Sequence, residues 1–511
     1  MFNNFEKIIN NSAKKYKDKD YIISADPLSK KYSFNDLKNF HLKMSYFLSE
    51  NKIFYQDKIL VIMHNSDLLT FLFLTIISNN RVFIPVNPRS SLDEVNYIIK
   101  QTQTKIAFIS DCYKKKFKKT DLGKKIFIAS DTEFIKKIQK FKKKTLPIHS
   151  FKKNPVAQIL FTSGSTGRPK GVVLTQKSIL HNIQGIKKRL GIIEKNPRFL
   201  AVTPLFHNNG QFIPTLLPLI LGGTTTPIQS ETSIISFWPV ALKNEINYSS
   251  VMSTHINYFS GMKINTKGHK LKWLFCGGAK LDENIRKKFE KKYKIRVATN
   301  YGLTETSSIA TSEGTNLNER KKGSVGRALY NNKIKILKKN KNDIDGEICI
   351  KGKNLFPYYL NQKKFSKSKF ENQWFKSGDL GYLDKDKFLF ITDRIDNMII
   401  VSGENIYPSE IEKYLHKFKG IKLGIVSSIP DKMTQNTLIL VYEGNKKINK
   451  NKLKKILSKY LPYFKIPKLI IHCKDLKLRE IPKAPNKKIL RSKLKKILIS
   501  KKNLIKKTNK L

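Results

Sequence analysis

The chain has 511 residues, which is enough for two or more domains with a substantial hydrophobic core. Its hydrophobic content of 40% and aromatic content of 11% exclude a disordered chain and predict a globular one. The formal net charge of +60 would suit a protein that binds nucleic acid or an anionic membrane. The lysines, however, are spread through the whole chain beside abundant asparagine and isoleucine, as a codon bias toward A and T produces. A basic surface-binding protein is therefore only a remote alternative, and we expect no specific nucleic-acid partner.

The four cysteines lie far apart and form no Cys-x-x-Cys pair: Cys112, Cys276, Cys349 and Cys473. This spacing indicates neither a disulfide framework nor a zinc site, so we expect reduced thiols and a cytoplasmic protein. The longest apolar runs, Leu68–Ile77 and Phe212–Leu221, are shorter than the roughly 20 residues that span a bilayer. They predict buried elements, and we expect no transmembrane segment.

Over the first 230 residues or so, the predicted elements alternate between strands and helices. Lys58–His64 and Lys105–Ser110 are short β-rich runs, and Ser91–Thr102 has a cap residue, an acidic first turn and helical apolar spacing. Val156–Thr162 is a strand-like run that enters a glycine-rich loop. Lys272–Leu281 repeats that pattern, with a buried strand before two glycines. The alternation predicts an α/β fold with mainly parallel sheets.

The pattern changes near residue 323, where short strand-like runs separated by turn residues predict a smaller β-rich layer. After Asp393–Asn397 a compact α+β unit begins, and it includes a lysine-rich amphipathic helix from about Lys450. The predicted organisation is a large multi-layer N-terminal domain over residues 1–395, with a β-rich subdomain over about 323–395. A small α+β C-terminal domain follows over residues 396–511.

The stretch FTSGSTGRPKG, Phe161–Gly171, combines three glycines, four hydroxyl residues and one lysine in eleven positions. Backbone N–H groups freed by glycine, together with hydroxyl donors, can wrap phosphate oxygens, and a lysine can balance their charge. The stretch does not match the phosphate loop of nucleoside triphosphatases, because Pro169 stands where that fingerprint requires glycine and Gly171 follows the lysine. It therefore predicts a phosphate-binding loop of another kind.

Six further motifs follow this loop in order. They are PLFHNNG (Pro204–Gly210), CGGAKL (Cys276–Leu281), NYGLTET (Asn300–Thr306), WFKSGDLG (Trp374–Gly381), DRIDNMIIVSGENIYPSEIE (Asp393–Glu412) and IPKAPNKKILR (Ile481–Arg491). Together with the glycine-rich loop, they resemble the adenylate-forming superfamily, which includes acyl-CoA synthetases, aryl-CoA ligases, luciferases and peptide-synthetase adenylation domains. The resemblance covers nearly the whole chain.

The resemblance implies an enzyme with a two-step reaction. A carboxylate attacks the α-phosphate of ATP and expels pyrophosphate, and the thiol of coenzyme A then displaces AMP from the acyl-adenylate to give acyl-CoA. ATP, Mg²⁺ and coenzyme A are the implied cofactors, a small carboxylic acid is the implied substrate, and fatty acid metabolism is one expected context. The nearest alternative loads the acyl group onto the pantetheine of a separate carrier protein. In either case the small C-terminal domain is implied to be mobile and to rotate between the half-reactions.

The matched motifs also imply roles for nucleotide-binding residues. The glycine-rich loop and Lys170 are expected to contact the β- and γ-phosphates, and Thr304 the α-phosphate. Glu305 is expected to hold Mg²⁺, whose hard charge suits carboxylate and phosphate oxygens. Tyr301 is expected to stack on adenine, and Asp379 to accept hydrogen bonds from the ribose. The implied cofactor-binding set is Thr162, Ser163, Gly164, Ser165, Thr166, Gly167, Lys170, Gly277, Gly278, Ala279, Asn300, Tyr301, Gly302, Asp379, Arg394, Asp396 and Gly403.

The last motif contains two adjacent lysines, and the resemblance puts Lys488 at the catalytic place and Lys487 where the family usually has glycine. Asp396 occupies the hinge position, and Gly403 lies in the loop that lines the pantetheine tunnel. His207 is expected to shape the carboxylate end of the acyl site. Amino-acid-activating relatives carry aspartate there, so a free amino acid is not expected as the substrate. The implied catalytic set is Lys488, Thr304, Glu305 and His207.

The resemblance also implies that the acyl site includes Asn208, Asn209, Cys276 and the Met252–His255 loop. Two asparagines admit a polar acid, and Cys276 admits an aliphatic or aromatic tail, so these residues do not decide the length of the acid. One further departure from the family pattern is Lys387, which stands at a usual turn glycine.

Overall fold

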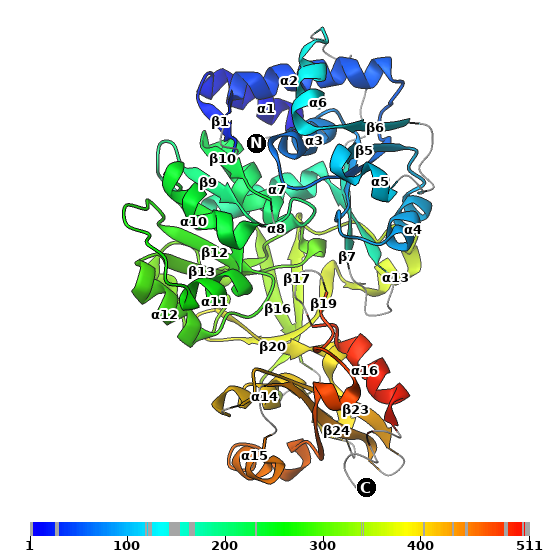
Figure 1. Ribbon diagram of the computed structural model, residues 1–511, viewed down its shortest axis with the longest axis vertical. Coiled ribbons are helices and arrows are strands. Elements are labelled where there is room, and N and C mark those ends of the chain that lie inside the picture. The colour runs from blue at the N-terminus through cyan, green and yellow to red at the C-terminus, as the bar shows by residue number, and fades with distance from the viewer. Residues whose placement is uncertain are drawn as a thin grey trace.

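The computed structural model describes residues 4–25, 30–117, 120, 125–142, 154–162, 169–229, 232–338, 340, 342–401, 404–418, 420–431, 434–444, 448–484, 489–502 and 505. In these ranges the strands form five sheets. Figure 1 shows two helix-covered sheets in the upper part of the molecule, an antiparallel layer below them, and a small lobe that contains the C-terminus.

The first sheet carries the glycine-rich loop. Its pairs are parallel except for the last, which is antiparallel. In spatial order the strands are β6 (Lys125–Ala129), β5 (Ile106–Ser110), β3 (Lys58–Ile62), β4 (Val82–Pro85), β7 (Val156–Thr162) and β8 (Lys170–Thr175). The β-rich runs expected from the sequence at residues 58–64 and 105–110 are confirmed as β3 and β5.

The second sheet is parallel through its centre and antiparallel at both edges. Its order is β15 (Arg327–Ala328), β14 (Thr311–Ser312), β13 (Arg296–Tyr301), β12 (Trp273–Gly277), β11 (Tyr248–Met252), β9 (Arg198–Ala201), β10 (Thr224–Pro227), β1 (Asp20–Ile23) and β2 (Lys31–Ser33). Because β11, β12 and β13 are parallel neighbours, their carboxyl ends lie at one edge of the sheet. The expected mainly parallel sheets are confirmed.

The third sheet forms the β-rich layer that the sequence predicts, and its strand pairs are antiparallel. It contains β16 (Asn332–Leu337), β17 (Gly346–Gly352), β19 (Trp374–Leu383) and β18 (Phe370–Glu371), and β20 (Leu389–Arg394) pairs with β19. The turn before β20 includes Lys387 at φ +62°, a left-handed conformation that favours glycine. This backbone conformation explains why the family usually has glycine at this position. In this chain lysine adopts the same left-handed conformation.

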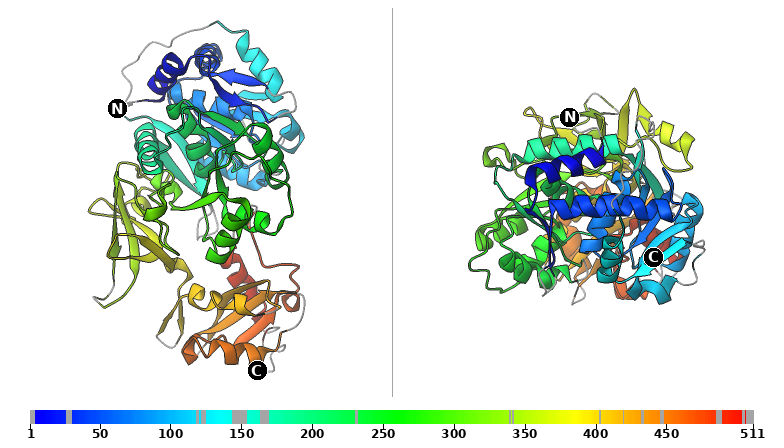
Figure 2. Two further views of the ribbon diagram at one scale, coloured as in Figure 1. Left: turned by 90° about the vertical axis from the view of Figure 1, so that its left-hand side faces the viewer. Right: turned by 90° about the horizontal axis from the view of Figure 1, so that it is seen from above.

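The C-terminal lobe has its own hydrophobic clusters on both faces of a three-stranded sheet. Its strands are β21 (Ile399–Val401), β22 (Glu404–Ile406), β23 (Leu423–Asp431), β24 (Gln435–Glu443) and β25 (Leu469–His472). Figure 2 shows this lobe below the rest of the chain in a second view as well. Mixed pairing and flanking helices make it an α+β unit, as the sequence predicts.

The helices cover the sheets and connect their strands. They are α1 (Phe5–Tyr16), α2 (Phe34–Glu50), α3 (Asp67–Ser78), α4 (Leu92–Thr102), α5 (Lys114–Phe117), α6 (Asp131–Gln139), α7 (Gln176–Leu190), α8 (Asn208–Gln211), α9 (Leu217–Leu221), α10 (Ser233–Lys243), α11 (Ser253–Gly261), α12 (Glu283–Tyr293), α13 (Lys363–Ser368), α14 (Pro408–Glu412), α15 (Lys450–Leu457) and α16 (Arg491–Ser500). Many begin at a side chain that caps a free N–H group, as Ser91 does for Glu94 in α4. Two short 3₁₀ helices matter for the site, η3 (Thr304–Thr306) and η5 (Ile395–Asn397).

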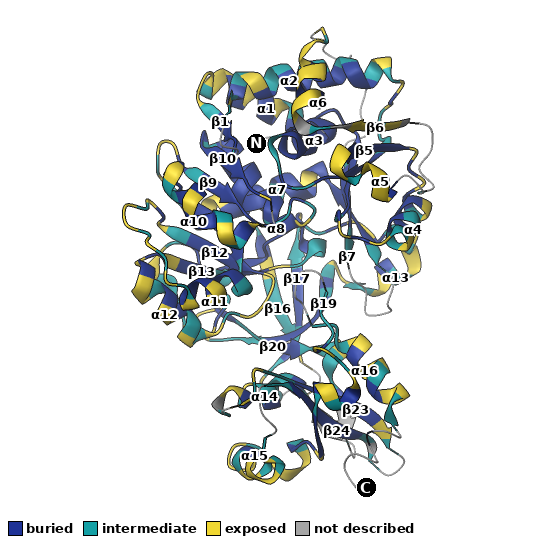
Figure 3. Cartoon of the chain, viewed as in Figure 1, coloured by how far each residue is buried: buried dark blue, intermediate teal, exposed yellow. Residues whose placement is uncertain are grey.

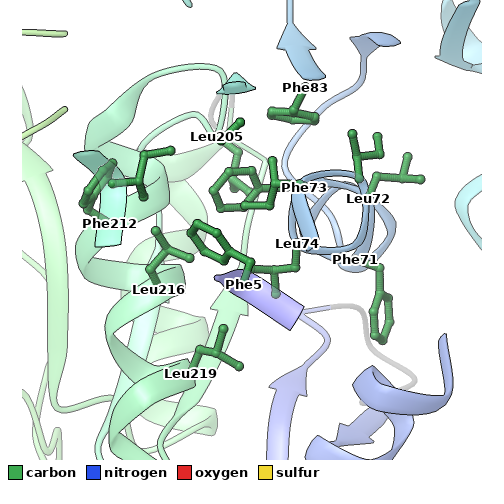
Figure 4. Packing of buried hydrophobic residues seen from close by; sticks show 14 of the residues in the cluster. Phe5, Phe71, Leu72, Phe73, Leu74, Phe83, Leu205, Phe212, Leu216 and Leu219 are labelled. Carbon is green, nitrogen blue, oxygen red and sulfur yellow. The ribbon is translucent and has the colours of Figure 1, made fainter. Parts of the chain in front are cut away.

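The largest core lies between the two upper sheets. Both long apolar runs are buried there, the first in α3 and the second in a π-helical turn, η2 (Phe212–Leu216), followed by α9. Figure 4 shows Phe5 of α1 between Leu74 of α3 and Leu216. Figure 3 shows the central strands buried, while α12 and α15 expose their outer faces. Across the described ranges, no helix combines the length and apolar character that crossing a bilayer requires.

One buried titratable group makes the stability of this core depend on pH. His41 of α2 is 3% exposed, its Nδ1 is 2.8 Å from the Ser78 hydroxyl and 3.1 Å from the Asn79 amide, and burial lowers its pKa from 6.5 to about 4. The unfolded chain therefore takes up a proton that the folded chain resists. We expect the free energy of unfolding to fall by on the order of 3 kcal/mol as pH decreases from about 6.5 to about 4.

Urea unfolding of the native protein and His41→Asn at pH 7.5 and pH 5 measures this effect. Asparagine keeps an acceptor for Ser78 and cannot be protonated in this range. The variant is expected to lose less stability than the native protein over the same interval. Equal losses in the two proteins would show that His41 does not carry the pH dependence.

Candidate functional site

The expected nucleotide-binding residues gather where three sheets meet. Thr162 at the end of β7 pairs with Lys170 at the start of β8, so the two ends of the glycine-rich loop lie side by side. Val172 of β8 forms a bridge with Tyr359, which precedes α13. Tyr301 at the end of β13 donates a hydrogen bond to Asp379 of β19 at 2.7 Å. The first and second sheets each therefore contact the third layer beside the loop.

Asp379 is the buried centre of a polar chain. Its Oδ2 accepts the bond from Tyr301, and its Oδ1 lies 3.1 Å from a guanidinium nitrogen of Arg394, the residue opposite it on β20. The same guanidinium lies 3.7 Å from Asp396, which is exposed. Burial and the neighbouring Asp379 carboxylate together raise the pKa of the Tyr301 hydroxyl, which keeps this group a donor. The polar chain joins the expected adenine, ribose and hinge residues.

Glu305 lies in η3, directly after Thr304, and its carboxylate is partly buried. Its Oε1 accepts a hydrogen bond of 2.8 Å from the Tyr359 hydroxyl, and its backbone oxygen accepts one from Phe356 N. Burial raises the pKa of this carboxyl, although the Tyr359 bond and the distant Arg394 charge oppose that shift. Within the described residues no cation contacts this partly buried carboxylate, which is therefore suited to receive one.

Lys170, the first residue of β8, feels the charge of Glu305. Burial and Lys369 lower the pKa of its ammonium group, and Asp396 and Glu305 raise it. Its Nζ lies 3.9 Å from the centroid of the Phe365 ring. The structure thus brings together the expected phosphate lysine, the expected metal ligand and the expected hinge residue.

Glycine is favoured at these motif positions for different physical reasons. A Cβ at Gly302 would lie 1.7 Å from the backbone oxygen of Ser308, so close packing within the chain already requires glycine. Gly278 has φ +83° and Gly378, before Asp379, has φ +76°. A Cβ at Gly277 would meet only ordinary contacts, at 3.7 Å or more. Its proposed role therefore depends on a ligand and not on the fold.

Two more expected nucleotide residues lie at the ends of β12 and β13. Asn300 is 9% exposed, and its buried Oδ1 has no hydrogen-bond partner among the described residues. Ala279, just beyond β12, is exposed. An unpartnered buried acceptor beside an exposed backbone turn leaves room for a ligand that donates a hydrogen bond.

The expected acyl-site residues separate into exposed and buried groups. His207 is exposed at the start of α8, and its backbone N–H donates to Pro204 O at 3.0 Å. Asn208 is 8% exposed, and neither amide atom has a partner among the described residues. The amide oxygen of Asn209 accepts a hydrogen bond of 2.7 Å from Ser250 Oγ.

The expectation that Cys276 offers surface to an acyl tail is not met. Its side chain is 2% exposed, packs in the cluster with Phe289 and Val297, and feels the charges of the buried Arg286–Glu313 ion pair. Burial raises the pKa of its thiol to about 12. The alternation of side chains along β12 turns Cys276 to the face that α12 covers. The motif CGGAKL alone does not show which face of the strand is covered.

The hinge motif is fastened at two points. Asp393 Oδ2 accepts a hydrogen bond of 3.0 Å from Ser409 N at the start of α14, and Ser409 Oγ donates to Thr392 O at 2.9 Å. These bonds tie the end of β20 to the first helix of the C-terminal lobe. Between these two anchor points lies η5 with Asp396.

The C-terminal lysine motif is anchored at both ends of its loop. Lys483 and Ile489 form an antiparallel bridge, and Leu490 N donates to Pro482 O at 2.9 Å. Arg491 then makes a double ion contact with Glu412 of α14. The expected residues that lie outside the described ranges are Ser163, Gly164, Ser165, Thr166, Gly167, Gly403, Lys487 and Lys488.

Three residues of this region were not expected from the sequence. Tyr359 and Phe365 contact Glu305 and Lys170, and Glu347 accepts a hydrogen bond of 2.9 Å from Gly378 N. None of them stands in a glycine-rich or charged motif. The only available signal is the density of aromatic residues in FPYYLNQKKF, Phe356–Phe365, which is equally typical of a core segment.

Comparisons with known proteins agree with this arrangement. Residues 9–360 match the sequence profile of the family described as AMP-binding enzyme. A 2-succinylbenzoate–CoA ligase of Staphylococcus epidermidis is 30% identical over 344 residues, which cover 67% of this chain and 71% of that protein.

Two solved structures of the o-succinylbenzoate–CoA synthetase of Bacillus subtilis share the fold. One, in complex with its acyl-adenylate intermediate, has a TM-score of 0.82 at 22% identity and covers 96% of this chain and 97% of that one. The other, in complex with ATP and magnesium ion, has a TM-score of 0.82 at 23% identity, with 96% and 99% covered. These likenesses establish the α/β fold with a large N-terminal part, a β layer and a small C-terminal lobe.

Proposed function

Because the chain belongs to the AMP-binding enzyme family, we propose that it is an AMP-forming carboxylic acid–CoA ligase. It activates the acid with ATP as an acyl-adenylate and transfers the acyl group to the thiol of coenzyme A. The observation that carries the proposal is the gathering of Lys170, Glu305 and Asp379 around the end of the glycine-rich loop. A cation for phosphates, a carboxylate for a metal ion and a carboxylate for a ribose are the groups that adenylation requires.

The nucleotide fits the residues at the ends of β12 and β13. Asp379 presents a carboxylate that is oriented by Tyr301 and Arg394, and because each carboxylate oxygen can accept more than one hydrogen bond, it can also receive ribose hydroxyls. The orphaned Oδ1 of Asn300 can accept a hydrogen bond from the adenine amino group. In this arrangement the buried Tyr301 side chain positions Asp379 as well as contributing a ring to the adenine side.

Magnesium fits the donor set as well. Glu305 supplies a hard carboxylate oxygen, and its partly buried charge is not contacted by any cation of the described chain. When bound, the ion would offset negative charge on the phosphates during the attack of the carboxylate. Lys170 holds the β- and γ-phosphates, and Thr304 donates its hydroxyl to the α-phosphate. Lys488 brings the substrate carboxylate and the α-phosphate together.

We propose a carboxylic acid without an α-ammonium group as the substrate. His207 stands at the start of α8, where amino-acid activators carry the aspartate that pairs with such a group. The Asn209–Ser250 pair and the unpartnered Asn208 favour an acid with an additional hydrogen-bonding group. A keto or aromatic acid, such as the one in the relatives' names, therefore precedes a fatty acid as a candidate.

Release of AMP and pyrophosphate from ATP and Mg²⁺ tests this function against a panel of acids. The panel holds 2-succinylbenzoate, simple aryl acids, fatty acids of several lengths and the standard amino acids, each with free CoA or with a carrier protein that bears pantetheine. We expect turnover with a non-amino acid and free CoA. Turnover only with amino acids would overturn the substrate proposal, and turnover only with the carrier would favour the carrier-loading alternative. No AMP from any acid would contradict the ligase.

A further inference from the structure

The phosphate lysine and the metal carboxylate both contact Tyr359 without pairing with each other. The charge of Glu305 raises the pKa of Lys170, so the two groups interact through space. Even so, no nitrogen–oxygen distance of 4.0 Å or less joins these two described residues. Opposite charges in a partly buried place attract strongly, so their separation needs a physical cause.

Two aromatic side chains supply that cause. Lys170 Nζ lies 3.9 Å from the centroid of Phe365 and 5.9 Å from that of Tyr359, within reach of a cation–π contact in both cases. The Tyr359 hydroxyl donates its hydrogen bond to Glu305 at 2.8 Å. Lys369 approaches the Phe365 ring from 5.6 Å and repels Lys170. Each charged group is thus held by a neutral ring system and not by the other.

The aromatic pair Tyr359–Phe365 is itself held firmly. Its rings lie 5.4 Å apart at 40°. Tyr359 N donates to Ser366 Oγ at 2.8 Å, and Leu360 N donates to Gly171 O at 2.7 Å. These bonds fix the aromatic pair to α13 on one side and to the strand that begins with Lys170 on the other.

We propose that the aromatic pair keeps Lys170 and Glu305 apart, so that both are available when ATP and magnesium arrive, and that Phe365 is the positioning residue for Lys170. This inference rests on the proposed roles of these two charged residues. A direct ion pair between them would have to be broken before either could bind its ligand. A ring holds an ammonium group more weakly than a phosphate does, so Lys170 leaves Phe365 readily when the phosphates bind.

Calorimetric titration with MgATP and, separately, with AMP tests the proposal without turnover. Phe365→Leu keeps an apolar side chain but removes the ring, and we expect its affinity for MgATP to fall about 10-fold. Its affinity for AMP should stay within about twofold, because AMP lacks the phosphates that Lys170 contacts. Phe365→Tyr should bind MgATP nearly as the native protein does. Tyr330→Leu removes a distant, exposed ring that Lys188 approaches to 4.4 Å, and it should change neither affinity.

Three results would overturn the proposal. The first is that Phe365→Leu binds MgATP as tightly as the native protein. The second is that Phe365→Leu loses affinity for AMP and MgATP in parallel. The third is that Phe365→Tyr binds MgATP as weakly as Phe365→Leu. The second result would mean that Phe365 only packs against its neighbours. A native protein that binds MgATP and releases no AMP with any acid would contradict the proposed ligase instead, and the ratios of affinity would still decide the role of Phe365.

Discussion

Replacing Lys488 with alanine is expected to slow acyl-adenylate formation by at least about 100-fold, while the conversion of pre-formed acyl-adenylate to thioester continues. Adenylation brings two anions together, and a cation that reaches both must offset their repulsion. The described residues on either side of this lysine, Lys483 and Ile489, form a bridge within the C-terminal lobe. A lysine there can approach in one orientation of the lobe and withdraw in another. ATP–pyrophosphate exchange and the second half-reaction measure the two steps separately.

The adjacent Lys487 provides the matched control. Neighbouring side chains in an extended or turn segment point apart, so Lys487 should not replace its neighbour. Lys487→Gly, which restores the family's usual residue, should leave exchange unchanged or faster. An inactive Lys487→Ala beside an active Lys488→Ala would mean that the assignment is wrong by one residue. Full activity in both variants would mean that this protein does not use the two-orientation mechanism.

Asp396→Pro should separate the half-reactions in the opposite sense. The residue lies in η5, where φ is near the value that proline fixes, so proline suits this conformation and opposes others. We expect adenylate formation to persist and thioester formation to fall by about 100-fold, since the backbone torsion can no longer change. Exchange of pyrophosphate and formation of acyl-CoA are the two measurements.

A second substitution controls for the side chain of Asp396. Its carboxylate lies 3.7 Å from Arg394 and raises the pKa of Lys170, so its loss alone has an electrostatic effect. Asp396→Ala removes that charge and keeps a free backbone, and it should retain both half-reactions to within about 10-fold. If proline and alanine reduce both steps equally, Asp396 acts through its charge and is not a hinge.

Local patterns in the sequence were enough to predict much of the fold. The capped helix α4 and the strands β3 and β5 appear where apolar spacing and turn residues indicate them, because their defining interactions lie within one segment. The parallel centre of the second sheet follows from alternation of strands and helices. The resemblance assigned roles to the motifs, and the structure brings together residues of the glycine-rich loop, Asn300–Thr306, Trp374–Gly381 and hinge motifs.

Contacts between distant segments could not be predicted in this way. Tyr359 and Glu305 are separated by 54 positions, and no local pattern around either residue predicts their hydrogen bond. The sequence around Phe365 does not mark it as a site residue. Its segment is brought beside Lys170 by the bridge between Val172 and Tyr359. The burial of Cys276 likewise depends on which face of β12 is covered by α12. Such partners are set by how sheets pack, which a single sequence does not record.

The two hydrogen bonds from Ser409 to β20 have a consequence for the relative populations of the lobe orientations in the proposed mechanism. They join the lobe to the rest of the chain across η5, so the proposed rotation of the lobe about Asp396 would break them. Two hydrogen bonds of ordinary strength together stabilise the present arrangement by about 1–3 kcal/mol, which corresponds to a bias of about 5- to 150-fold in population. Such a bias is too small to stop a catalytic cycle. It is large enough to determine which lobe orientation predominates when no substrate is bound. If the lobe rotates as the proposed mechanism requires, Ser409 would act as a latch whose strength sets which half-reaction a newly arrived substrate meets first.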